Sequence, residues 1–271
     1  MEEFEDREVY KLYRSVDALI HPVISKKNIS LYKIILDENI LPVRVFYPKK
    51  MSETKEIIIY MHGEISVVGS ENEYGSILKT LAYDLNKIIV AIDYNTYLNY
   101  KDIVLNSYST IKYLYDEFNK IGYTNLILSG DSTGAGLLIH INDLLRKDKI
   151  YFDKSILFYP TITGKYNKKS KYESISKYSH LDMFTIKALD KYFGKIDEES
   201  CFDASKIKYD GKLLLFVGKA DPLRDEIIDF YKNNIISSKL VQLDFCGHGF
   251  LIEKDSELRQ EIYNDINKFL S

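Results

Sequence analysis

The stretch that decides the fold is Leu126-Ile127-Leu128-Ser129-Gly130-Asp131-Ser132-Thr133-Gly134-Ala135-Gly136-Leu137-Leu138. It begins with an apolar run typical of a buried strand and ends in apolar residues at helical spacing. Between these two parts stands the pattern Gly-x-Ser-x-Gly, with Ser132 at its centre. The two flanking glycines remove side chains that would collide in so sharp a turn from strand to helix. We therefore expect Ser132 to stand exposed in a strained conformation, although a glycine-rich connection without chemistry fits the same letters.

On both sides of this stretch, strand patterns alternate with helix patterns, which predicts a mostly parallel sheet covered on both faces. Further strands are predicted at Leu31–Leu36, Leu41–Tyr47, Ile57–Met61, Ile88–Ile92, Ser155–Tyr159, Lys212–Val217 and Lys239–Phe245. The first two of these read as an antiparallel hairpin. The alternation breaks between about residues 163 and 205, so we interpret that stretch as an insertion within a single domain of residues 1–271.

The bulk composition excludes several classes of partner. Lys plus Arg is 37 against 40 for Asp plus Glu, a net charge of −3, which gives no support to nucleic acid or an anionic membrane. The two cysteines, Cys201 and Cys246, fit a reducing compartment better than a disulfide framework. The acidic N-terminus lacks the order of a secretory signal, and no apolar run approaches the ~18 residues of a membrane span. We expect a soluble, cytoplasmic protein.

Two later loops supply the partners that a nucleophilic serine needs, namely a base and a carboxylate that orients the base. Asp221 follows one predicted strand, and His248 follows the next, between two glycines. In a parallel sheet both would lie at the carboxyl edge, where Ser132 is also expected. Each has a plainer interpretation, because Asp221-Pro222 is also the pattern of a helix N-cap and His248 could be an ordinary loop histidine.

The chain resembles the hormone-sensitive-lipase-like carboxylesterases of the α/β-hydrolase superfamily over about residues 57–252. The elbow Gly130-Asp131-Ser132-Thr133-Gly134, the acid motif Asp221-Pro222-Leu223-Arg224-Asp225-Glu226 and His248-Gly249-Phe250 carry the resemblance. It implies an α/β-hydrolase fold, with a mostly parallel eight-stranded sheet, helices on both faces and a small helical cap from about residues 1–30 and 163–205. It also implies that Ser132 is the nucleophile, His248 the general base and Asp221 the orienting acid, with Asp225 as the second candidate.

The loop after Met61 departs from this family, whose oxyanion loop begins His-Gly-Gly-Gly. Here the loop reads His62-Gly63-Glu64-Ile65. Because any residue except proline carries a backbone N–H, we expect Gly63, Glu64 and Thr133 to form the oxyanion hole, with His62 bracing the loop. The changes to Glu64 and Ile65 nevertheless add charge and bulk where the family has glycine.

These patterns together predict a serine carboxylesterase that acts on small or medium acyl esters through an acyl-enzyme, without metal or cofactor. The partner would be a small-molecule ester, and monomer and homodimer both stay open. The same residues would suit a weakly active or inactive binding protein, or an amide or formamide hydrolase. Four insertion aromatics are expected to line the acyl site: Tyr166, Tyr172, Tyr178 and Phe184. We interpret Cys246 as a small buried hydrophobe and the Lys168–Lys171 cluster as a solvated face.

Overall fold

A computed structural model describes the chain at residues 22–26, 29–36, 39–49, 56–63, 71–94, 100–163, 203–253 and 255–271. Side chains are described from residue 41 on, apart from those at 71–73. The insertion at about 164–202 and most of the N-terminal segment therefore lie outside the described residues, and so do the four expected acyl-site aromatics and the Lys168–Lys171 cluster.

Nine described strands form one sheet in the order β1-β2-β3-β5-β4-β6-β7-β8-β9. The strands are β1 (Pro22–Lys26), β2 (Ile29–Leu36), β3 (Asn39–Phe46), β4 (Glu56–Met61), β5 (Ile88–Ile92), β6 (Asn125–Asp131), β7 (Lys154–Phe158), β8 (Lys212–Gly218) and β9 (Ser238–Leu243). The predicted hairpin is confirmed, since β2 pairs antiparallel with β3. All pairings from β5 through β9 are parallel, so the mostly parallel sheet is confirmed as well.

The prediction of eight strands is one short of the nine described, because Pro22–Lys26 forms β1 at the edge of the sheet. This segment pairs antiparallel with β2 and so belongs to the sheet, not to a cap. Its five residues are too few to show a period, and an edge strand is held mainly by backbone hydrogen bonds to a single neighbour.

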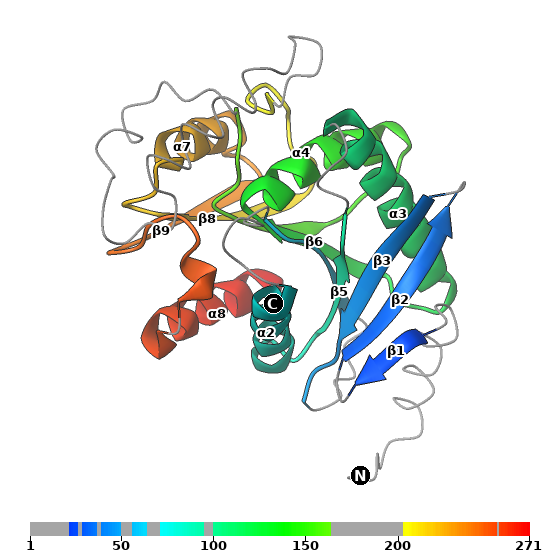
Figure 1. Cartoon of the computed structure of the whole chain (residues 1–271). Coiled ribbons are helices and arrows are strands. Elements are labelled where there is room, and N and C mark those ends of the chain that lie inside the picture. The colour runs from blue at the N-terminus through cyan, green and yellow to red at the C-terminus, as the bar shows by residue number, and fades with distance from the viewer. Residues whose placement is uncertain are drawn as a thin grey trace.

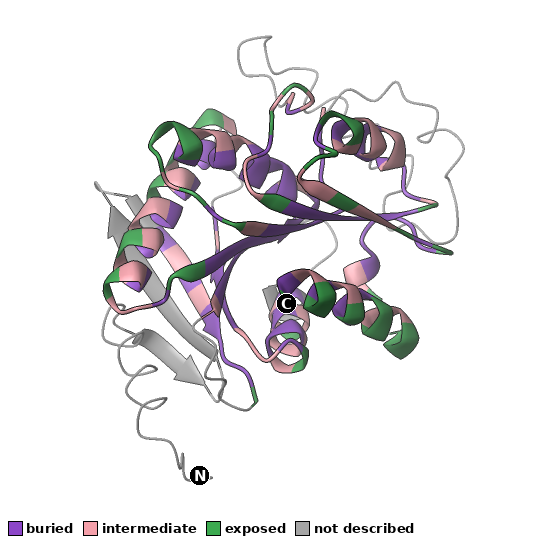
Figure 2. Cartoon of the chain, turned by 180° about the vertical axis from the view of Figure 1, so that it is seen from behind, coloured by how far each residue is buried: buried purple, intermediate pink, exposed green. Residues whose placement is uncertain are grey.

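Helices cover both faces of the sheet, as Figure 1 shows. One face carries α3 (Tyr100–Lys120), α4 (Ser132–Lys147) and α7 (Arg224–Asn233), and the other carries α2 (Glu71–Asp84) and α8 (Ser256–Leu270). Each helix turns its buried side to the sheet and its exposed side to solvent (Figure 2). This is the arrangement that the alternation of strands and amphipathic helices predicts.

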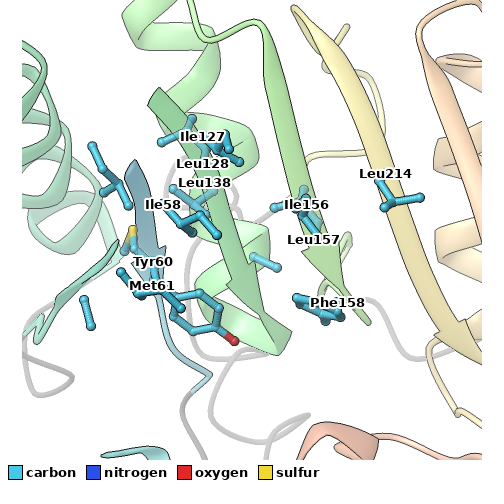
Figure 3. Close-up of a cluster of buried hydrophobic side chains, with 14 of the residues drawn as sticks. Ile58, Tyr60, Met61, Ile127, Leu128, Leu138, Ile156, Leu157, Phe158 and Leu214 are labelled. Atoms are coloured by element: carbon cyan, nitrogen blue, oxygen red, sulfur yellow. The ribbon is translucent and has the colours of Figure 1, made fainter. Parts of the chain in front are cut away.

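The core includes a cluster of buried apolar side chains from the neighbouring strands β4, β6 and β7 (Figure 3). Ile57, Ile59 and Leu128 are completely buried, as expected for central strands covered on both faces. Parallel pairing places the ends of β4 and β6 side by side, with Met61 opposite Gly130. The loop after β4 therefore begins directly beside Ser132.

Candidate active site

Ser132 lies at the junction between β6 and α4, where the sequence predicts a strained turn. Its φ of 50° places a non-glycine residue in the left-handed region, which is the strain expected of a nucleophile elbow. The prediction that glycine is needed on both sides is confirmed. A Cβ at Gly130 would lie 2.6 Å from the Met61 carbonyl oxygen, and one at Gly134 would lie 2.3 Å from the carbonyl oxygens of both Met61 and His62.

Replacing Gly134 with alanine is therefore expected to destabilise the protein by about 1–3 kcal/mol, because the new methyl group overlaps two backbone oxygens that cannot rotate away. Gly75 is the matched control. It lies in α2, and the nearest heavy atom to its Cβ position, in Arg44, is 3.9 Å away. Alanine there should stabilise by about 0.5–1 kcal/mol through helix propensity. Urea unfolding measures the free energy of unfolding of both variants. Equal values for Gly134→Ala and Gly75→Ala would contradict the close approach of Gly134 to the two carbonyl oxygens.

A continuous line of hydrogen-bonding groups joins Ser132 to two later loops. Ser132 Oγ is 2.8 Å from His248 Nε2, and His248 Nδ1 is 3.1 Å from Asp221 Oδ2 and 3.2 Å from Oδ1. A carboxylate can only accept, so Nδ1 carries the proton and Nε2 is left to accept from the serine hydroxyl. Ser132 is 7% exposed, which differs from the exposed position expected, because the loops of His248 and Gly63 pack over it.

Asp221 faces the histidine but is not the N-cap of α7, the plainer interpretation of its sequence pattern, because α7 begins at Arg224 with Leu223 as its N-cap residue. One carboxylate oxygen accepts from the Leu223 backbone N–H at 2.7 Å, which fixes the turn that leads into α7. Both oxygens also face His248, and the side chain is fully buried. The second candidate acid, Asp225, instead accepts from the Arg224 side chain at 3.1 and 3.2 Å. The structure thus brings Asp221, not Asp225, to the histidine.

The His248 ring is held by aromatic packing that the sequence pattern did not indicate. Its centroid is 4.7 Å from that of Tyr159, which in turn packs edge-on against Phe250 at 4.7 Å. Gly249 adopts a φ of 80°, which turns the chain sharply after the histidine. Tyr159 itself has a positive φ of 37° directly after β7. Such a backbone conformation in a large aromatic residue cannot be inferred from periodicity.

The expected oxyanion donors have different positions in the structure. Thr133 is the second residue of α4, and N–H groups in a first helical turn have no acceptor within their own helix. The Gly63 N–H, in contrast, donates to Asp131 Oδ1 at 2.9 Å. Glu64, and with it Ile65, lies outside the described residues. Because its N–H is already paired with a buried carboxylate, Gly63 does not fit the expected role of oxyanion donor, and Thr133 and Glu64 stay the two candidates.

His62 braces the start of this loop, as the sequence comparison with the family implied. Its Nδ1 is 2.9 Å from the Gly63 carbonyl oxygen, and its ring stacks on Tyr94 with centroids 4.9 Å apart. The Tyr94 hydroxyl donates to the His62 carbonyl oxygen at 2.7 Å. His62 Nε2 lies 3.8 Å from Asp93 Oδ1, which also pairs with Arg44. Both the ring and the backbone of His62 are therefore fixed by neighbouring groups.

A family model described as alpha/beta hydrolase fold matches residues 58–251, a range that contains Ser132, Asp221 and His248. The chain belongs to this family of hormone-sensitive-lipase-like esterases. An α/β hydrolase of Acanthamoeba polyphaga mimivirus is 23% identical to it over 214 residues. That alignment takes in 74% of this chain and 62% of the viral protein, so the hydrolase spans less than two thirds of that relative.

Solved structures of esterases share the fold of this hydrolase. The Pyrobaculum calidifontis esterase superposes with a TM-score of 0.76 at 20% identity, covering 96% of this chain and 88% of the other. The thermostable carboxylesterase EstE1, cloned from a metagenomic library, gives a TM-score of 0.73 at 21% identity, with coverages of 95% and 92%. An iron-lacking apo form of EstFA gives 0.76 at 21% identity, with coverages of 98% and 92%.

Other candidate groups in the hydrolase have structural roles or lie apart from the site. Cys246 is buried, and burial raises the pKa of its thiol to about 11, so the group stays protonated as a small hydrophobe. Burial lowers the pKa of His140 to about 4, which keeps that ring neutral. In the part of the chain that the structure describes, no group of three or more His, Cys, Asp or Glu residues is placed to hold a metal ion. None of the described helices is long and apolar enough to cross a bilayer.

Proposed function

We propose that this hydrolase is a serine carboxylesterase that cleaves esters of small or medium acyl chains through a Ser132–His248–Asp221 triad. The observation that carries the proposal is the 2.8 Å approach of Ser132 Oγ to His248 Nε2, on an imidazole whose other nitrogen faces buried Asp221. A hydroxyl next to a neutral imidazole, itself oriented by a carboxylate, is the arrangement that activates serine for acyl transfer. Membership in an esterase family supports the same activity.

In this mechanism Ser132 Oγ attacks the ester carbonyl carbon while His248 Nε2 takes the hydroxyl proton. Asp221 stabilises the imidazolium that results. Collapse of the tetrahedral intermediate breaks the bond to the alcohol, and His248 returns the proton to that leaving oxygen. Water then enters and attacks the acyl-enzyme carbonyl while His248 takes its proton. When the second tetrahedral intermediate collapses, His248 returns that proton to Ser132 Oγ, the acyl bond to Ser132 breaks and the carboxylic acid is released.

The developing oxyanion requires N–H donors on the side opposite the leaving group. Thr133 supplies one from the start of α4, where the helix dipole also favours negative charge. Glu64 supplies the second from the loop after β4. The side-chain charge of Glu64 and the bulk of Ile65 distinguish this loop from the family pattern. They favour a narrower range of acyl groups, or a lower turnover rate, than a triple-glycine loop would give.

A fluorophosphonate probe tests the activation of Ser132 directly, because it reacts covalently only with a serine made nucleophilic by its neighbours. The wild-type hydrolase is expected to gain one probe adduct, located on the peptide that contains Ser132 by mass spectrometry. His248→Ala should abolish the adduct while the variant still unfolds cooperatively. An unlabelled wild-type protein would favour the alternative of a hydrolase-fold protein that binds a ligand without turnover.

A substrate panel separates the ester reaction from the amide alternative. Matched p-nitrophenyl esters and p-nitroanilides of the same acyl groups differ only in the bond that is cleaved. We expect turnover of the acetyl and butyryl esters and none of the corresponding anilides, because an alcohol leaves more easily than an amine. Equal turnover of both series would replace the carboxylesterase proposal with an amidase.

A further inference from the structure

Asp131, the residue directly before Ser132, has a buried carboxylate that the proposed triad does not use. It is 1% exposed and accepts three hydrogen bonds. Tyr60 Oη donates to Oδ1 at 2.8 Å, the Gly63 N–H donates to Oδ1 at 2.9 Å, and Tyr74 Oη donates to Oδ2 at 3.0 Å. The donors come from β4, from the loop after β4 and from α2. We name these four residues the Asp131 cluster.

The direction of the Asp131 side chain is unusual for its position. Asp131 is the N-cap residue of α4, where an aspartate normally accepts from the backbone N–H groups of its own helix. Its side chain makes no such cap hydrogen bond. The carboxylate is turned instead toward Gly63, a residue 68 positions earlier in the chain. The hydrolase thus uses this aspartate to hold a neighbouring loop instead of its own helix.

Gly63 is confined between this carboxylate and the nucleophile. A Cβ at Gly63 would lie 2.7 Å from Asp131 Oδ2, 2.8 Å from Ser132 Cβ and 3.1 Å from Tyr74 Oη. The backbone of Gly63 therefore approaches Ser132 more closely than a residue with a side chain could. This close approach explains why a glycine is required at position 63.

Both ends of Gly63 are fixed by hydrogen bonds. Its N–H donates to Asp131, and its carbonyl oxygen accepts from His62 Nδ1 at 2.9 Å. The carbonyl belongs to the peptide group that joins Gly63 to Glu64, and in a planar trans peptide the N–H points opposite to the C=O. Holding the Gly63 carbonyl toward His62 therefore also sets the direction of the next N–H, the one proposed as an oxyanion donor.

A buried carboxylate has an energetic cost that an apolar residue would avoid. Burial raises the pKa of Asp131, and the hydrogen bonds from Tyr60 and Gly63 act against that rise. Nothing in the packing of β6 requires a charge here, since the neighbouring positions of the strand are apolar or small. A group that is costly to bury, that makes no cap hydrogen bond to its own helix and that accepts from the N–H of a neighbouring loop suggests a role in placing that loop.

We propose that Asp131 is a positioning residue for the oxyanion hole: with Tyr60 and Tyr74 it fixes Gly63 against Ser132 and so orients the following N–H. The inference rests on the proposed esterase activity. Releasing Gly63 should affect the transition state, in which the oxyanion exists, more than the bound ester. Its signature is a lower kcat with little change in KM.

Asp131→Ala tests this placement by removing the acceptor for Gly63. Because loss of one oxyanion donor lowers turnover by about 10²–10³, we expect kcat for p-nitrophenyl butyrate to fall by up to about this factor with KM nearly unchanged. Asp131→Asn keeps an oxygen that can accept from Gly63 and Tyr60, so it should recover most of the lost kcat. A merely structural role would not produce this recovery at constant KM.

Tyr74→Phe provides a second test if Asp131→Ala does not fold. It removes only the hydrogen bond to Oδ2 and should lower kcat moderately, again at constant KM. Tyr123→Phe is the matched control, since Tyr123 is a buried tyrosine whose hydroxyl has no hydrogen-bond partner among the described residues. Its kcat should equal that of the wild type.

The outcomes separate this inference from the proposed function. A wild-type protein without Ser132-dependent turnover would overturn both. Normal wild-type turnover together with unchanged kcat in folded Asp131→Ala, or in Tyr74→Phe where alanine unfolds, would overturn the positioning role alone. A fall in kcat that Asp131→Asn does not relieve would also overturn it, because that result would assign the effect to the charge or the fold.

Discussion

Replacing Ser132 with alanine is expected to lower kcat for p-nitrophenyl butyrate by about 10⁶-fold, because the nucleophile and its hydrogen bond to His248 disappear together. Triad members act as a unit, so the loss reflects the covalent pathway as a whole. The small side chain should be accepted by the fold, since alanine has no atom that the serine lacks. Initial rates measured by release of p-nitrophenol, with the uncatalysed rate subtracted, give the ratio.

Ser129→Ala is the control for this substitution. Ser129 lies three residues earlier, in β6, and it is also buried, at 3% exposure. Its loss removes an equivalent hydroxyl without touching the line from Ser132 to Asp221, and kcat should not change. Equal rates for wild type and Ser132→Ala would reject the proposed esterase activity and leave the alternative of a ligand-binding protein.

Asp221→Asn should have the second-largest effect, a fall in kcat of about 10⁴-fold. The amide oxygen can still accept from the Leu223 N–H and so preserve the turn into α7. The amide cannot, however, stabilise the imidazolium as a carboxylate does, and it favours the tautomer whose Nε2 carries the proton. That nitrogen then no longer accepts from Ser132.

Asp225→Asn is the matched control, because Asp225 belongs to the same motif but accepts from Arg224 instead of His248. Its steady-state parameters should match those of the wild type under identical assay conditions. A larger loss in Asp225→Asn than in Asp221→Asn would reverse the assignment of the acid. Circular dichroism of both variants shows whether α7 is retained.

The fold was predictable because its signals are local. Continuous apolar runs such as Ile57–Met61 mark central strands, and amphipathic periods mark the helices between them. Turn residues such as glycine and proline then mark where each strand ends and which residues form the loop after it. The three residues of the proposed triad could be placed together for the same reason, since parallel pairing from β6 to β9 brings the carboxyl ends of these strands to the same side of the sheet. β1 was missed because five residues at the sheet edge carry no period.

The Asp131 cluster could not be predicted, because its contacts join distant parts of the chain. Tyr60 and Tyr74 lie 71 and 57 residues from Asp131, and nothing local to the elbow points to either. The sequence does show that Asp131 ends an otherwise apolar strand, and a buried carboxylate there needs hydrogen-bond partners. Predicting which partners would have required the packing of α2 against the sheet, which local sequence does not specify.

The 116-residue separation of Ser132 and His248 has a consequence for how the protein is made. Residues up to 163 already contain the elbow strand, its helix and the loop after β4, but the acid and the base arrive only with β8 and β9. A nascent or truncated chain that ends before residue 238 would carry a serine with no imidazole to accept its proton. Reactivity toward a fluorophosphonate would therefore appear only after His248 has been added, and it would report chains translated past that residue.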